Sequence, residues 1–248
     1  MDKTIFPAGS TQAVRYAADF FEGTRLRLSR DISQADYILL DIPTFNASGQ
    51  LRDGRSLREI TKNVRNDSVM IGGNLIHPDL EGFATLDLLQ DAEYLAQNAY
   101  ITAECALDVA LPYLTVTLRN CPVLILGWGR IGKCLARLLK ALDADVTVAA
   151  RKEADRAMLS AMGYGIWDYS GKESICNYRL IFNTVPKTVL NREQMAACHP
   201  DCVKIDLASS PGMEDEDVII ARGLPGLHFP ESTGRLIAQT ILRKENLM

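Results

Sequence analysis

The sequence lacks the long apolar run that a membrane span requires, because no stretch approaches the ~18 apolar residues needed. Its first residues, MDKTIFPAGS, also lack the apolar core of a signal peptide. There is no excess of positive charge: the net charge is −4, and Lys and Arg are scattered, which argues against a nucleic-acid-binding surface. We therefore expect a cytoplasmic protein that binds neither membranes nor nucleic acids.

Clustered metal ligands are also scarce. The 6 cysteines are dispersed, and without a secretory signal they indicate reduced thiols. The segment Cys198-His199-Pro200-Asp201-Cys202 brings two thiols and a histidine together, but no second ligand pair accompanies it, so we expect no metal site. No G-x-S-x-G elbow is present, which argues against serine nucleophile chemistry.

What the sequence does contain is the pattern of a globular α/β protein. Apolar residues make up 47% and charged residues 23%, and 248 residues allow one large domain or two modest ones. Alternating strands and helices favour mostly parallel sheets. We expect strands at 4–6, 37–40, 68–73, 123–126, 146–150, 180–182 and 203–207, and helices at 10–21, 57–64, 101–118, 131–142, 153–162, 215–221 and from 232.

The most informative stretch is VLILGWGRIG at 123–132, where an apolar strand runs into a G-x-G-x-x-G turn. A helix and a second strand follow, and this order is the context in which the motif binds a dinucleotide. Gly127 permits the tight turn, Gly129 lets the backbone approach a pyrophosphate, and Gly132 lets the helix pack on the strand. The helix N-terminus then offers N–H groups to the phosphates. The alternative is a βαβ unit that binds nothing.

Arg151 and Lys152 follow the second strand of this unit, where an acidic residue would bind the ribose 2′-hydroxyl of NAD. An arginine there instead accommodates the 2′-phosphate of NADP, so we favour NADP and keep NAD as the second choice. The alternative is that both residues are merely exposed at a helix start. Farther along, Asn183-Thr184-Val185-Pro186 and 208–212 are small or polar residues beyond strand ends, the edge where parallel sheets bind ligands.

We therefore expect a doubly wound parallel-sheet Rossmann domain at 101–231 and a smaller, truncated α/β domain at 1–100. The helix at 232–248 is expected to pack back on the first domain. Only Gly9 of a glycine pattern follows the first strand, so no second nucleotide site is expected there.

Five landmarks give the sequence a resemblance to the family of dipicolinate synthase A subunits. They are Asn98 with Thr102-Ala103-Glu104, the GWGRIG turn, Asn183-Thr184-Val185-Pro186, Asp206-Leu207-Ala208-Ser209 with Pro211-Gly212, and Gly223-Leu224-Pro225-Gly226 followed by Pro230 and Gly234. The resemblance implies a two-domain fold like that of D-2-hydroxyacid dehydrogenases, NADP as cofactor, a flavoprotein-like B subunit as partner, and a role in sporulation. It also implies oxidation of a dihydrodipicolinate-type ring to dipicolinate, and a homo-oligomer is expected.

Three titratable residues are candidates for catalysis. Lys187 is a cation suited to a substrate carboxylate, His228 can exchange protons near neutral pH, and Glu104 belongs to a family landmark. The alternative for each is a structural or solvated side chain. Arg15, Arg130 and Arg235 are the other cations considered for the substrate.

The remaining assignments form two sets. The cofactor-binding candidates are Gly127, Trp128, Gly129, Arg130, Ile131, Gly132, Arg151, Lys152, Asn183, Thr184, Val185, Pro186, Leu207 and Ala208. The substrate-binding candidates are Thr102, Ser209, Ser210 and Ser232.

A diverged, non-catalytic Rossmann protein that binds a dinucleotide or a partner protein is the alternative function. The family often has a basic residue where Ser210 stands and a lysine where Glu231 stands. Glu231 opposes a dicarboxylate substrate, so these two positions favour the alternative.

Overall fold

The computed structural model describes residues 3–46, 48–169 and 174–246. The chain divides into two compact units, one made of Met1–Ile101 with Pro225–Met248 and the other of Thr102–Leu224. The sequence placed the second boundary at 231, seven residues later. The difference arises because the helix at Pro225–His228 packs against the first unit's helices. With this C-terminal segment included, the two units are nearly equal in length.

In the described part of the first unit, five parallel strands form one sheet in the order β2-β1-β3-β4-β5. This is the doubly wound order of flavodoxin-like sheets. The strands are β1 (Lys3–Pro7), β2 (Leu26–Leu28), β3 (Tyr37–Leu39), β4 (Val69–Gly72) and β5 (Ala84–Asp87). The helices are α1 (Gln12–Phe20), α2 (Leu57–Thr61), α7 (Pro225–His228), α8 (Pro230–Lys244) and the first part of α3 (Ala92–Ala110).

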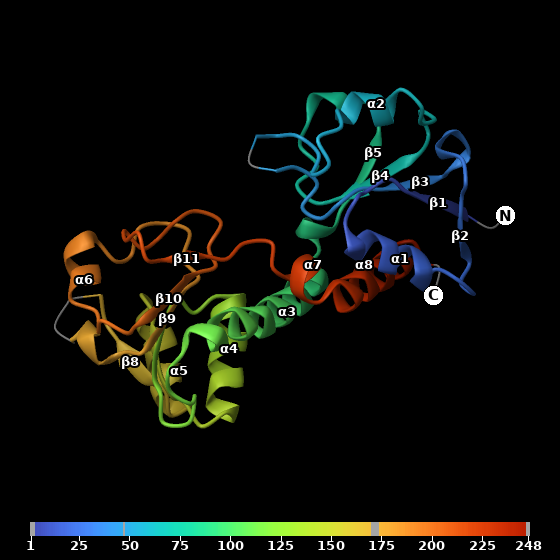
Figure 1. The fold of residues 1–248 in the computed structure, drawn as a ribbon. Helices are drawn as coiled ribbons and strands as arrows, with labels where there is room; N and C mark the ends of the chain where they lie inside the picture. The colour runs from blue at the N-terminus through green and yellow to red at the C-terminus, as the bar shows by residue number, and fades with distance from the viewer. Residues whose placement is uncertain (1–2, 47, 170–173, 247–248) are drawn as a thin grey trace. The chain divides into compact units, whose positions relative to one another are not determined.

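The side chains of strand β3 show that apolar clusters cover both faces of this sheet. Its side chains alternate, so Tyr37 and Leu39 join the apolar cluster under α1 and α8 while Ile38 joins the cluster under α2. All three are buried, as expected for a parallel strand with helices on both sides. In Figure 1 the red helix α8 runs beside the blue helix α1. Gly234 permits this close packing, since a Cβ there would lie 2.6 Å from the Ala13 carbonyl oxygen.

The turn after β1 is built around a buried carboxylate. Asp41 accepts hydrogen bonds from the backbone N–H groups of Ser10 and Thr11 at 3.0 Å and from both hydroxyls. These amides lie where α1 begins, the position at which a helix N-terminus binds a phosphate. An anionic side chain of the protein itself therefore takes that position.

In the described part of the second unit, six parallel strands follow the order β11-β10-β9-β6-β7-β8, which is the Rossmann order. The strands are β6 (Pro122–Leu126), β7 (Asp145–Ala149), β8 (Gly165–Trp167), β9 (Leu180–Asn183), β10 (Val203–Asp206) and β11 (Ile219–Ile220). The helices are α4 (Arg130–Ala141), α5 (Glu153–Ala161), α6 (Arg192–Ala196) and the second part of α3. The α/β class and the Rossmann domain are confirmed.

Two predicted helices have other bounds in the structure, and a third does not form. The helix expected at 101–118 is α3, which begins at Ala92 because Asp91 accepts a hydrogen bond from the Tyr94 N–H, and which ends just before Pro112. The helix expected at 215–221 does not form: Asp215 instead pairs with Lys204, and Ile219–Ile220 adds a strand beside β10. The last helix begins at Pro230 rather than at 232. Among the described helices, none is long and apolar enough to cross a membrane.

Within the first unit, Asp91 also joins the start of α3 to the end of α8. Its side chain, 7% exposed, lies 2.7 Å from the Arg243 guanidinium and 2.8 Å from the Lys244 ammonium. Burial opposes ionisation, but the hydrogen bonds from Lys244, the Tyr94 N–H and Arg243 outweigh it and hold the Asp91 pKa well below its ordinary value.

We expect Asp91→Asn to lower the free energy of unfolding by about 1–2 kcal/mol at pH 7, since its two cationic partners are partly exposed and screened. A lowered native pKa stabilises the fold above the unfolded value and loses this effect as the pH falls. The difference between variant and wild type should therefore shrink below about pH 4 in urea unfolding curves. Glu93→Gln, whose carboxylate is 55% exposed beside Arg243, is the control and should change little. An equal loss at pH 7 in both variants would contradict this assignment.

Candidate cofactor-binding site

A cavity of about 380 Å³ lies in the second unit at the carboxyl ends of β6, β7 and β9. It is lined by eight residues that the sequence assigned to the cofactor and by four that it did not. The assigned ones are Gly127, Trp128, Gly129, Arg151, Lys152, Thr184, Val185 and Pro186; the others are Ala149, Ala150, Asp155 and Tyr169. Three stretches far apart in the sequence thus meet at the edge where α/β sheets bind ligands.

Two of the three motif glycines are required by the protein's own backbone. Gly127 has a φ of +106°, and a Cβ there would lie 2.6 Å from the Thr184 hydroxyl. A Cβ on Gly132 would overlap the Gly127 carbonyl oxygen, because the first turn of α4 crosses β6 at close range. Both residues therefore shape the turn whether or not a ligand is present.

Gly129 differs from them. Its φ of −81° and ψ of −168° are open to any residue, and a Cβ there would meet no described atom within 4 Å. It is the N-cap of α4, and no described side chain caps this end of the helix. Open space in front of a helix N-terminus fits a pyrophosphate, whose oxygens the N–H groups and the helix dipole favour. The residues present therefore fit a dinucleotide.

Arg151 and Lys152 are exposed on the loop between β7 and α5, within the cavity wall. Arg156 fixes this loop by donating to the carbonyl oxygens of Ala150 at 3.2 Å and Arg151 at 2.7 Å. Asp155, in the first turn of α5, lines the same cavity. Two cations and one carboxylate therefore surround the place where a ribose 2′ substituent would be recognised.

Trp128 and Tyr169 supply the aromatic part of the wall. The Trp128 ring packs edge-on against Tyr164 with centroids 5.9 Å apart, and the Lys133 ammonium lies 5.7 Å from its centre. Tyr169 follows β8, a strand that the sequence analysis did not predict, and so it was missed. Burial raises the Tyr169 pKa, and the nearby charge of Arg151 partly offsets that effect.

A buried polar pair holds the two loops beyond β9 and β10. Asn183 and Asp206 are both fully buried, and the Asn183 amide donates to Asp206 at 3.1 Å and to the Val185 carbonyl at 3.0 Å. Asp206 also accepts from the N–H groups of Ala208 at 3.0 Å and Gly212 at 2.7 Å. The Asn183 side chain thus forms hydrogen bonds inside the protein, and we propose that it positions the Val185 loop rather than contacting the cofactor.

The same network brings the candidate substrate loops together. Gly212 packs against the backbone of Val185 and Lys187, and its carbonyl oxygen accepts from Val189 at 2.8 Å. Ser209 and Ser210 are exposed on one of these loops and Lys187 is exposed on the other. A cation and two hydroxyls therefore lie on adjoining loops at one sheet edge, which suits a carboxylate ligand.

The other predicted residues lie elsewhere. Arg130 and Ile131 form the first turn of α4, and Leu207 and Ala208 are buried just after β10. Thr102 is buried in α3 and Glu104 is exposed on it, both in the second unit. His228, at the end of α7, and Ser232, exposed on α8, belong to the first unit. The roles proposed for these residues in catalysis and substrate binding stay predictions.

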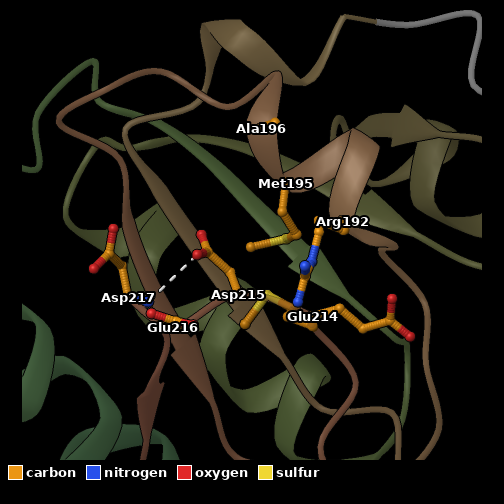
Figure 2. A pocket seen from close by; sticks show the side chains of 8 residues that line it. Arg192, Met195, Ala196, Glu214, Asp215, Glu216 and Asp217 are labelled. Atoms are coloured by element: carbon orange, nitrogen blue, oxygen red, sulfur yellow. Dashed lines mark hydrogen bonds between the residues drawn. The ribbon is translucent and has the colours of Figure 1, made fainter.

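A larger cavity of about 640 Å³ lies between α6 and the loop at 213–217 and includes none of the predicted residues. Its wall carries Arg192 and four acidic side chains, Glu214, Asp215, Glu216 and Asp217. Figure 2 shows that these carboxylates do not converge on one point, and Asp215 accepts a bond from the Asp217 N–H. Such a wall repels phosphates, and no group of three metal ligands occurs among the described residues.

Comparisons with known proteins agree with this geometry. The family described as D-isomer specific 2-hydroxyacid dehydrogenase, NAD binding domain, matches residues 93–221. The A subunit of dipicolinate synthase from Bacillus subtilis (strain 168) is 31% identical over a region covering 58% of this chain and 52% of that protein. The matched region thus spans about half the length of that relative.

Solved structures share the fold at lower identity. The A subunit of dipicolinate synthase from Bacillus halodurans has a TM-score of 0.84 at 23% identity, with 98% of each chain covered. A transhydrogenase from Sinorhizobium meliloti has a TM-score of 0.74 at 14% identity, covering 98% of this chain and 93% of its own. The two-sheet architecture is therefore one that this chain shares with both proteins.

Proposed function

We propose that this chain, which belongs to the D-isomer specific 2-hydroxyacid dehydrogenase family through its NAD-binding domain, is an oxidoreductase that uses NADP. The observation that carries this proposal is the cavity in which the Gly129 turn and the Arg151–Lys152 loop face the same space. The turn suits the pyrophosphate and the two cations suit a 2′-phosphate. NAD is the second choice of cofactor, and Asp155 in the cavity wall would accept a hydrogen bond from its ribose 2′-hydroxyl.

We further propose that the substrate is a dihydrodipicolinate-type ring, oxidised to dipicolinate. The support is the 31% identity to a protein named as the A subunit of dipicolinate synthase, together with Lys187, Ser209 and Ser210 on adjoining loops. The reaction moves one hydride from the ring to the nicotinamide and releases one proton, and aromatisation of the ring drives it. Bound NADP would accept that hydride. The protein's part is to bind the ring's carboxylates, for which we propose Lys187, and to accept the proton, for which we propose His228 or Glu104.

A second type of polypeptide is part of this proposal, because the relative is named as one subunit of a synthase. We propose a flavoprotein-like B subunit as the partner, in addition to self-association of this chain. Co-purification with the product of a neighbouring reading frame tests the partner separately from the cofactor.

The non-catalytic alternative has one specific observation in its favour. Arg235, a candidate cation for the substrate, lies 3.2 Å from the Glu231 carboxylate and is thereby partly neutralised. A protein that binds the dinucleotide but does not turn over substrate would have the same cofactor cavity. The experiment must therefore separate binding from turnover.

Binding is measured by thermal shift with NADP, NAD and dipicolinate. NADP at ~100 times its Kd should add ~2.7 kcal/mol and raise the Tm by about 5–10 °C. Trp128 lies in the cavity wall, so NADPH should also quench tryptophan emission.

Turnover is then followed at the nicotinamide absorbance band with a dihydrodipicolinate. If no dinucleotide shifts the Tm, both proposals fail, while a shift without turnover favours the non-catalytic alternative.

A further inference from the structure

The segment Cys198-His199-Pro200-Asp201-Cys202 has a structure that the cofactor site does not explain. It links α6 to β10 in a tight turn, in which the Cys198 N–H donates to the Met195 carbonyl at 3.1 Å and the Cys202 N–H donates to the His199 carbonyl at 2.9 Å. The turn returns the chain on itself, so that Cys198 packs against the apolar cluster to which Cys202 belongs. The backbone therefore places the two cysteines beside the same cluster.

The two thiols have different surroundings. Cys202 is 7% exposed and packs in the apolar cluster with Met195 and Met213, whereas Cys198 is half-buried at the edge of that cluster. The Cys198 thiol donates to the Gln194 carbonyl and the Cys202 thiol donates to the Val203 carbonyl, each at 3.7 Å. The neighbouring Cys202 thiol and the Lys204 ammonium lower the Cys198 pKa, whereas the neighbouring Cys198 thiol and burial raise the Cys202 pKa. One partner is thus a reachable nucleophile and the other a protected thiol beside it.

A metal site accounts for this cluster less well. The His199 imidazole uses Nδ1 to accept the Asp201 N–H at 3.1 Å, and so closes the turn. No third metal ligand joins the two thiols within the described residues. Two neighbouring thiols that no third ligand joins are an arrangement from which a disulfide forms by thiol oxidation.

We propose that Cys198 and Cys202 are a dithiol pair that a peroxide oxidises to an intramolecular disulfide. The Cys198 thiolate attacks one peroxide oxygen, the O–O bond breaks, and the hydroxide that leaves takes up a proton to become water. Cys198 is then a sulfenic acid. The Cys202 sulfur attacks the Cys198 sulfur, the S–O bond breaks, and the departing hydroxide takes the Cys202 proton as a second water. Two sulfurs are oxidised by one electron each, and the peroxide is reduced by two.

The pair lies away from the cofactor cavity. Cys202 precedes the first residue of β10, whereas Asp206, which holds the loops beside the cavity, is the last residue of that strand. The disulfide would pin the end of α6 to the start of β10 and leave the Gly129 turn untouched. Oxidation is therefore expected to leave dinucleotide affinity unchanged, and its test is independent of the proposed cofactor.

The experiment treats the folded full-length chain with hydrogen peroxide, denatures it, alkylates free thiols and digests it with trypsin. Cleavage after Arg192 and Lys204 puts both cysteines in one peptide, 193–204. The expected product is this peptide without alkyl groups and lighter by two hydrogens, returned to two alkylated cysteines by prior treatment with a thiol reductant. Cys176, which is exposed, is the internal control for general oxidation.

Two variants test the assigned order. Cys202→Ser should stop at a Cys198 sulfenic acid that dimedone traps, and Cys198→Ser should leave Cys202 reduced at the same peroxide dose. The proposal is overturned if peptide 193–204 still takes two alkyl groups when Cys176 is already oxidised. It is also overturned if zinc added alone protects both thiols and binds at one equivalent to the wild type but not to the variants.

Discussion

Replacing Arg151 and Lys152 together by alanine is expected to weaken NADPH binding about 100-fold, because two charge-assisted contacts of about 1.5 kcal/mol each are lost. Binding of NADH should change by less than about twofold, since its 2′-hydroxyl carries no charge for the two cations to neutralise. Both residues are exposed on the β7–α5 loop, so the fold should not suffer.

The expected selectivity follows from the side chains that remain in and beside the loop of the variant. Arg156 holds the loop through two backbone carbonyls, and neither bond needs the Arg151 side chain. Asp155 remains in the wall as an acceptor for a 2′-hydroxyl. The variant should therefore prefer NAD, reversing the order expected of the wild type.

Fluorescence titration with both reduced cofactors measures this change. The matched control is Arg119→Ala with Arg137→Ala, which removes the same charge from exposed positions of the second unit that do not line the cavity. Equal weakening of NADPH by the control would mean that net charge, not a phosphate contact, sets the affinity. Unchanged NADPH affinity in the Arg151 and Lys152 variant would remove the argument for NADP.

The second unit could be predicted from the sequence because its signals are local. An apolar strand, three glycines, a helical stripe and a second strand lie within 123–150, and the structure confirms β6, α4 and β7 there. Most of the predicted cofactor residues meet in one cavity because strand ends in a parallel sheet share one edge. The order of these elements along the chain and the shared edge of parallel strands were sufficient to predict the second unit and its cavity.

Other parts have no such signal. The sequence analysis missed strands β2, β5, β8 and β11, which have two to four residues each and are the edge strands of the two described sheets. An edge strand this short shows no periodic apolar pattern, and pairing with its neighbour creates it. Tyr169 was missed because it follows β8, and Asp155 because it looks like any acidic residue in a first helical turn. The assignment of Asn183 to the cofactor stays a prediction, and the sequence did not indicate that its amide is buried against Asp206, a contact between residues 23 positions apart. Long-range partners of this kind do not leave a pattern in one sequence.

Gly129→Val is expected to lose dinucleotide binding and keep its stability, whereas Gly132→Ala is expected to lose stability. Gly129→Val should leave the fold intact, because the backbone there is extended and nothing described lies within 4 Å of its Cβ. Its side chain would fill the space in front of α4, so dinucleotide affinity should fall by about 100-fold or more, as expected when a backbone can no longer approach a pyrophosphate.

Gly132→Ala tests the other half of the motif. Helix propensity alone would stabilise α4 by about 1 kcal/mol. The new Cβ overlaps the Gly127 carbonyl oxygen, however, and overpacking against backbone should lower the free energy of unfolding by about 3 kcal/mol. The sign of the change in urea unfolding therefore decides between propensity and steric overlap. If Gly129→Val destabilises the chain as much as Gly132→Ala, or binds NADPH as the wild type does, then the open space at Gly129 does not accommodate the phosphates.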